Sequence, residues 1–103
     1  MTVSIQYIDM PESESLSAIV TRNLHKLAHK YQFIIRGDVY FKLGQGTDGN
    51  DKICEIKLSV PGPQIFAKTI ENNFEKSAAE NIGDLERQLR KRKEKFNRRK
   101  KAI

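Results

Sequence analysis

Positive charge is the chemical feature that the sequence concentrates most strongly. Residues 87–101 include ten Lys or Arg residues and one acidic residue, Glu94, so this segment carries a charge of +9. The rest of the chain contains nine basic and twelve acidic residues and is mildly acidic. Such local charge suits a polyanion such as the phosphate backbone of a nucleic acid, or else it forms a solubilising or frayed tail.

Two histidines have a spacing that could hold a metal ion. His25 and His29 are four residues apart, which places both imidazole rings on one face of a helix. No glutamate follows His25 and no third nearby ligand is evident, so we predict no metal site. Both histidines are then polar members of a basic face, and they would gain charge near a phosphate.

The sequence lacks the motifs that indicate cofactor binding or catalysis. Gly44, Gly46 and Gly49 form a glycine-rich connection without the lysine and hydroxyl residue of a phosphate-binding loop. No serine or cysteine has a histidine and an acid beside it in a recognisable motif, and no pair of carboxylates stands out. We therefore predict a flexible hairpin at residues 44–51, no cofactor and no enzymatic activity.

Length and composition predict one small domain. A chain of 103 residues with 38% hydrophobic residues can bury a single core without disulfides, and its one cysteine, Cys54, lies in an apolar run. No apolar stretch approaches the roughly 20 residues that span a bilayer. The N-terminus also lacks a basic segment followed by an apolar one. We predict a cytoplasmic protein with one domain, residues 1–103, whose basic tail at about 97–103 frays in isolation.

Alternating apolar residues predict four strands, at residues 3–7, about 35–43, 53–60 and 64–70. In the second strand, Val39, Phe41 and Leu43 share the face that points to the core, and Tyr40 points away from it. The glycine-rich connection joins the second and third strands as a hairpin. A turn at residues 61–63, Pro-Gly-Pro, joins the third and fourth.

Apolar residues at helical spacing predict two long amphipathic helices. The first falls within residues 11–31, with Ser13 as its N-cap. The second begins after Asn72 or Asn73, and its apolar stripe consists of Phe74, Ala78, Ile82, Leu85, Leu89 and Phe96. The order β-α-β-β-β-α predicts an α+β two-layer sandwich, a four-stranded sheet with both helices packed on one face.

The cationic side chains point away from the apolar stripes of both helices. At 100° per residue, Arg87, Arg90, Lys91 and Arg98 lie opposite the stripe of the second helix. On the first helix the corresponding residues are Arg22, His25, Lys26, His29 and the adjacent Lys30. Two helices on one face of a sheet would bring these residues side by side, so we predict one broad basic surface.

A surface of this kind suits RNA better than duplex DNA. It can neutralise backbone phosphates, and arginine adds bidentate contacts that lysine cannot make. No helix presents the residues expected of a recognition helix in a major groove, so recognition of backbone and shape is expected. Tyr40 could stack on a base, although a tyrosine on an open sheet face is more often a packing residue.

Two stretches of the sequence resemble a known family. Val60 and the two residues after it spell VPG, and residues 84–96 spell DLERQLRKRKEKF, of which LERQLRK at 85–91 is the most specific part. With these two stretches, the sequence resembles the ribosome hibernation promoting factors over nearly its whole length. Members are also called ribosome-associated inhibitors, ribosomal subunit interface proteins or sigma-factor modulation proteins.

The resemblance implies a ribosomal target. Family members bind small-subunit rRNA in the mRNA channel, over the A and P sites of the decoding region. They block tRNA and mRNA binding there and repress translation in stationary phase or stress. Neighbouring ribosomal proteins are further expected partners, and the protein is expected to be monomeric off the ribosome. The residues that match the family's rRNA-binding positions are Lys26, His29, Arg87, Arg90 and Lys91.

Departures from the family pattern qualify this expectation. Asp84 stands where relatives often have lysine, and His29 stands where lysine is common. The chain ends just after the second helix, as expected of a short-form member, and its basic end favours the type that promotes ribosome pairing. An alternative function is an RNA-independent protein-interaction regulator, for example of a sigma factor, in which the basic surface meets an acidic protein.

Overall fold

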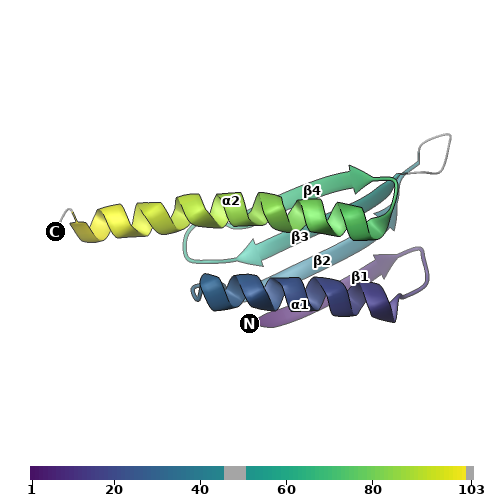
Figure 1. Ribbon diagram of the computed structural model, residues 1–103, viewed down its shortest axis with the longest axis horizontal. Coiled ribbons are helices and arrows are strands. Elements are labelled where there is room, and N and C mark those ends of the chain that lie inside the picture. The colour runs from purple at the N-terminus through teal and green to yellow at the C-terminus, as the bar shows by residue number, and fades with distance from the viewer. Residues whose placement is uncertain (46–50, 102–103) are drawn as a thin grey trace.

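Four strands and two helices form two layers, with both helices on the same face of the sheet (Figure 1). The computed structural model describes residues 1–45 and 51–101, with side chains described as far as Arg98. The elements are β1 (Thr2–Ile8), α1 (Glu14–Lys30), β2 (Arg36–Leu43), β3 (Lys52–Ser59), β4 (Ile65–Glu71) and α2 (Phe74–Lys101). The predicted order and fold class are confirmed. The central residues of the predicted hairpin loop, including Gly46 and Gly49, lie outside the described residues.

The sheet has the strand order β1-β2-β3-β4. Strand β1 pairs in parallel with β2, with Ile5 opposite Val39. The connection from β1 to β2 is α1, which returns the chain to the end of the sheet where β1 began, so both strands run the same way. The β2–β3 and β3–β4 pairs are antiparallel, as predicted. This topology leaves α1 over the β1–β2 half and α2 over the β3–β4 half, and the two helices run in the same direction (Figure 1).

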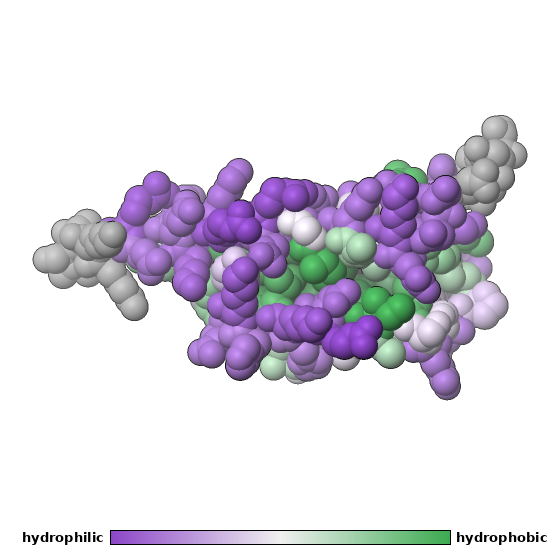
Figure 2. All heavy atoms as spheres, viewed as in Figure 1, coloured by the Kyte–Doolittle hydropathy of each residue, from purple (hydrophilic) through white to green (hydrophobic). Residues whose placement is uncertain are grey.

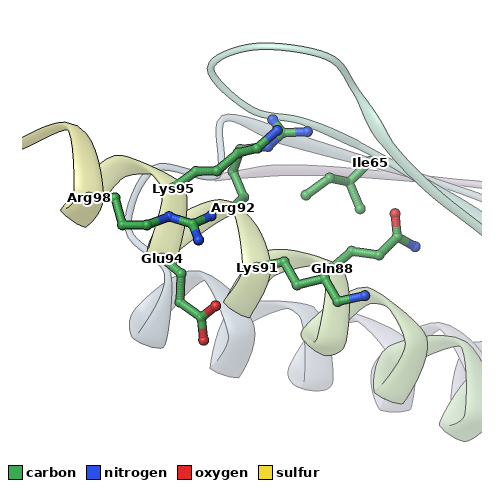
Figure 3. Close-up of a pocket in the computed structure, with 7 residues that line it drawn as sticks. All are labelled: Ile65, Gln88, Lys91, Arg92, Glu94, Lys95 and Arg98. Atoms are coloured by element: carbon green, nitrogen blue, oxygen red, sulfur yellow. The ribbon is translucent and has the colours of Figure 1, made fainter.

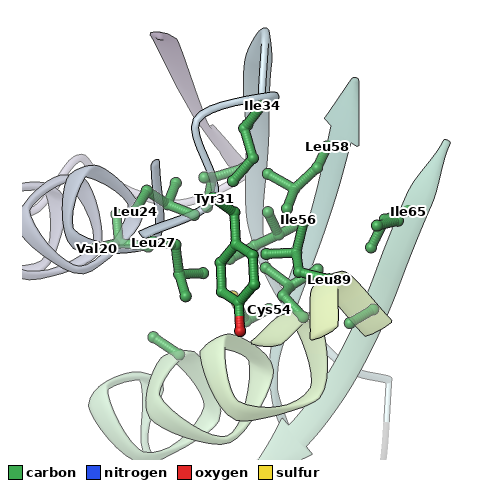
Figure 4. Packing of buried hydrophobic residues seen from close by; sticks show 14 of the residues in the cluster. Val20, Leu24, Leu27, Tyr31, Ile34, Cys54, Ile56, Leu58, Ile65 and Leu89 are labelled. Atoms are coloured by element: carbon green, nitrogen blue, oxygen red, sulfur yellow. The ribbon is translucent and has the colours of Figure 1, made fainter. Parts of the chain in front are cut away.

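The core lies between the layers and is built from alternate strand residues. Val39, Phe41, Cys54, Ile56 and Leu58 are all completely buried beneath the helices. Figure 4 shows this packing, with Tyr31 extending from the end of α1 toward α2. Burial raises the pKa of the Cys54 thiol to about 12, in agreement with its prediction as a small buried residue.

The prediction that Leu43 belongs to the core is wrong. Leu43 has the expected orientation, but its side chain is 48% exposed. It is the last residue of β2, and its neighbours across the sheet are Lys52 of β3 and Glu71 of β4. The row that contains Leu43 therefore lies beyond the apolar core.

Both helices begin at a capping side chain. The Ser13 hydroxyl accepts a hydrogen bond from the Leu16 N–H over 3.2 Å, which confirms the predicted cap of α1. The Asn73 side-chain oxygen accepts one from the Lys76 N–H over 2.7 Å at the start of α2. These caps fix where each helix starts, and hence which of its residues face the sheet.

Two polar residues lie inside the apolar stripe of α2. Ser77 and Asn81 are fully buried. The Asn81 amide donates to the carbonyl oxygens of Cys54 on β3 and Ala67 on β4, both over 2.9 Å. The Ser77 hydroxyl donates to the Thr69 carbonyl over 2.9 Å. These bonds anchor α2 in register on β3 and β4, so they also set the position of the basic residues further along the helix.

Candidate nucleic-acid interface

The helix layer presents a mostly hydrophilic face. Figure 2 shows that hydrophilic side chains cover both helices, with apolar surface visible between them. On α1, the predicted residues Arg22, His25, Lys26 and His29 are all exposed. The buried residues of the same helix are Leu16, Val20, Leu24 and Leu27, so core packing turns the basic side of α1 outward.

The two helices meet in an ion-pair network around Glu86. Lys30, at the end of α1, donates a hydrogen bond to a carboxylate oxygen of Glu86 over 3.0 Å. Arg90, one turn further along α2, lies 3.6 Å from the same oxygen. The hydrogen bond and charge of Glu86 raise the pKa of Lys30. Two predicted cations therefore already share one acidic partner within the protein.

A second acid lies on the outer face of α2. Asp84 forms an ion pair with Arg87, three residues later in the helix. Arg87 is exposed and keeps donors for a further partner, but its charge is partly neutralised by this neighbour. Asp84 is thus the ion-pair partner of one of the predicted RNA-binding arginines.

The side of α2 that faces β4 carries two cations that helix geometry alone did not identify, Arg92 and Lys95. They line a hollow of about 370 Å³ together with the predicted residues Lys91 and Arg98. Figure 3 shows Arg92 and Lys95 extending toward the turn between β3 and β4, whereas Glu94 points away from it. The basic surface therefore wraps around α2 toward the edge of the sheet.

Arg92 is held in place by the Pro-Gly-Pro turn. Its guanidinium donates a hydrogen bond to the Pro61 carbonyl over 2.8 Å. The next residue, Gly62, has φ +88°, and a Cβ atom there would lie 3.2 Å from the Arg92 guanidinium. A glycine at this turn thus permits the close approach of the arginine, and the remaining guanidinium donors are available to a phosphate.

Aromatic side chains support the end of α2 that extends past the sheet. Phe33, just after α1, packs edge to face against Phe96 of α2, with ring centroids 5.2 Å apart. Phe33 also contacts Tyr31, and the Lys93 ammonium lies 5.7 Å from the Tyr31 ring centroid. These contacts hold the cationic end of α2 beside the end of α1.

The structure brings five of the nine predicted site residues together in two groups. His29, Lys30 and Arg90 lie where the helices meet, and Lys91 and Arg98 lie on the β4 side of α2. Arg22 is separated from Lys30 by eight residues, about 12 Å along α1. Tyr40 lies on the opposite face of the sheet, so it cannot share a ligand with these cations.

Sequence reasoning missed four residues of this surface: Glu86, Arg92, Lys93 and Lys95. The adjacent Pro-Gly-Pro turn was the available signal for Arg92. Within the described residues, no group of three potential metal ligands comes together. No helix in this part of the chain has the length and apolar character to cross a membrane.

Comparison with known proteins places the chain in context. Residues 3–97 match the sequence profile of a family described as Sigma 54 modulation protein / S30EA ribosomal protein. The structure is similar to that of a ribosomal subunit interface protein from Coxiella burnetii, with a TM-score of 0.81 and 22% identity, covering 90% of this chain and 98% of that one. It is also similar to the N-terminal domain of Protein Y from Thermus thermophilus, with a TM-score of 0.70 and 16% identity, covering 87% and 93%. No curated protein sequence matches.

Proposed function

Because this chain belongs to the Sigma 54 modulation protein / S30EA ribosomal protein family, we propose that it is a ribosome hibernation factor. It binds rRNA of the small subunit in the mRNA channel, over the A and P sites, and represses translation in stationary phase or stress. The family match confirms the resemblance carried by residues 84–96. The names of the two similar structures, a ribosomal subunit interface protein and Protein Y, support a ribosomal target.

The observation that carries the proposal is the exposed cationic surface across both helices. Arg22, His25, Lys26 and His29 on α1, and Arg87, Arg90, Lys91 and Arg98 on α2, are all exposed. Both helices pack against one sheet, so the backbone positions that carry these cations are set before any ligand arrives. Binding a folded RNA then orders the exposed side chains but requires no folding of the backbone.

The proposed mechanism is occupancy of the channel. Cations on both helices contact backbone phosphates, and the domain then fills the space that tRNA and mRNA would use. Binding requires no covalent chemistry, so the function that we propose is not enzymatic. Location in the cytoplasm, with ribosomal proteins of the decoding region as neighbours, follows from this target.

Cosedimentation with purified small subunits and a reconstituted translation reaction test the proposal together. The protein is expected to pellet with small subunits at low salt, to compete with tRNA and mRNA, and to inhibit peptide synthesis at the same concentrations. A protein that stays in the supernatant at low salt would exclude the proposed function. Inhibition without competition against tRNA or mRNA would exclude the proposed binding site.

A sigma-factor regulator is the second candidate, because the family description includes modulation of sigma 54. In that case the basic surface contacts an acidic protein and no RNA is needed. A pull-down from lysate with and without nuclease separates the two functions. Loss of ribosomal components after RNA digestion supports the first, whereas a non-ribosomal partner that survives digestion supports the second.

A further inference from the structure

We propose that the recess between the end of α1 and the 93–97 turn of α2 binds one unpaired nucleobase of an RNA strand. The recess has a volume of about 380 Å³ and is open to solvent. Its α2 residues belong to the part of the helix that extends past the sheet (Figure 1). The inference rests on the proposed RNA-binding function. It adds a contact to a base where the cationic surface supplies contacts to phosphates.

The apolar wall of the recess is aromatic. Phe33 and Phe96 meet at 84°, edge to face, so each ring keeps a face that the other does not cover. Both side chains are only half-buried, unlike Tyr31 behind them, which is 3% exposed. Flat, partly exposed rings are the usual platform on which a protein stacks an unpaired base, because every base has an aromatic face.

The rim of the recess carries amide groups. Gln32 and Asn97 both line it, one from the segment after α1 and one from α2, and both are exposed. No hydrogen bond engages either side-chain amide among the described residues. A free amide offers a donor and an acceptor, which is what the hydrogen-bonding edge of a base requires.

Cationic side chains line the recess beside the aromatic rings. The ammonium groups of Lys93 and Lys30 each lie 5.7 Å from the centroid of the Tyr31 ring. Lys30 is engaged by Glu86, whereas Lys93 has no ion pair with a described residue. Exposed His29 lines the recess as well. This combination of aromatic rings, free amides and cations favours an RNA strand over an apolar peptide.

Oligonucleotides with and without bases test the site directly. We expect a single-stranded RNA tetramer to shift the ring NMR signals of Phe33 and Phe96 in the full-length protein. An abasic chain of equal length and charge should bind the cations without moving these ring signals. Equal ring shifts with both ligands, or none with the base-bearing RNA, would overturn the proposal.

Binding to small subunits gives an independent test. Phe96→Leu keeps an apolar side chain and removes the flat ring, so we expect affinity to fall roughly tenfold with an unchanged salt dependence. Phe96→Tyr should retain the wild-type affinity. Phe66→Leu is the matched control, because Phe66 is 48% exposed and lies on the opposite face of the sheet.

These results separate the site from the proposed function. Wild-type affinity in Phe96→Leu would overturn the nucleobase site and leave ribosome binding intact. Equal losses in Phe96→Leu and Phe96→Tyr would also overturn it, because tyrosine keeps the flat ring and the loss would then not come from stacking. Base-dependent ring shifts without binding to small subunits would support the nucleobase site and exclude the ribosomal target.

Discussion

Lys30 of α1 and Glu86 of α2 are joined by a hydrogen bond of 3.0 Å, although 56 residues separate them in the sequence. The same carboxylate lies 3.6 Å from Arg90. Glu86 therefore has two effects on the basic surface. It attracts the cations of both helices to one place, and it neutralises part of the charge that RNA phosphates would use.

The first prediction concerns the removal of that acid. In Glu86→Gln, Lys30 and Arg90 lose their shared partner, so both become available to phosphates. Affinity for small subunits should rise, and the dependence of log K on log salt should steepen by up to two phosphate contacts, about 0.7–0.9 each. A salt titration by cosedimentation measures both quantities.

Glu55→Gln is the matched control for this change. Glu55 pairs with Lys42 on the open face of the sheet, so its substitution also frees a lysine, but away from the proposed interface. Affinity in Glu55→Gln should equal that of the wild type. Weaker binding by Glu86→Gln would show that the acid is needed to hold the helices together and would contradict the prediction.

The second prediction concerns Asp84. Its ion pair with Arg87 must be broken or shared when Arg87 contacts a phosphate. Asp84→Asn should therefore raise affinity severalfold and add about 0.7–0.9 to the salt slope, one phosphate contact. Asp38→Asn frees Arg36 on the opposite face and should have no effect on affinity. Unchanged affinity in Asp84→Asn would mean that Arg87 is not part of the interface.

The third prediction contrasts two glycines. Gly62→Ala should lower the free energy of unfolding by about 1–2 kcal/mol, because φ is +88° and the new methyl group approaches Arg92. Gly83→Ala, within α2, should raise it by about 0.5–1 kcal/mol, since the nearest atom to the added Cβ is the Arg87 guanidinium at 3.8 Å. Urea titrations of both variants measure the difference. Effects of the same sign would contradict the positive φ at Gly62 or the open helical position of Gly83.

The fourth prediction concerns pH. The Cys54 thiol has a pKa of about 12 in the folded protein, against an ordinary value of 9.0. The unfolded state therefore releases this proton first, so the contribution of Cys54 to stability is constant below about pH 8 and falls as pH rises through 9 toward 12. The stability advantage of the wild type over Cys54→Ala should shrink by roughly 1 kcal/mol between pH 8 and 10. An advantage that does not change with pH would show that the thiol titrates normally.

Much of the fold could be predicted from the sequence, because burial imposes the periods of strands and helices. Leu16, Val20 and Leu24 on α1, and Leu85 and Leu89 on α2, are buried as the helical spacing predicts. The pairing of β1 with β2 could not be read from the same pattern. Alternation tells which face of a strand is buried but does not tell which strand lies beside it.

The candidate site was less predictable, since it depends on contacts between distant segments. Helix geometry did not identify Arg92, because only the position of the β3–β4 turn reveals its bond to Pro61. The pairing of Glu86 with Lys30 depends on how α2 is placed along α1. Asn81, which anchors α2 on β3 and β4, is polar and was not recognised within the apolar stripe.

The most direct test of the basic surface compares two double charge reversals in one salt titration with small subunits. Arg87→Glu/Lys91→Glu reverses two predicted cations of α2, and Lys57→Glu/Lys68→Glu makes the same change in net charge on the open face of the sheet. The first variant should lose most of its affinity and about 1.4–1.8 of the salt slope, whereas the second should keep both. Equal binding by the two variants would contradict the assignment of the two-helix surface as the RNA-binding site.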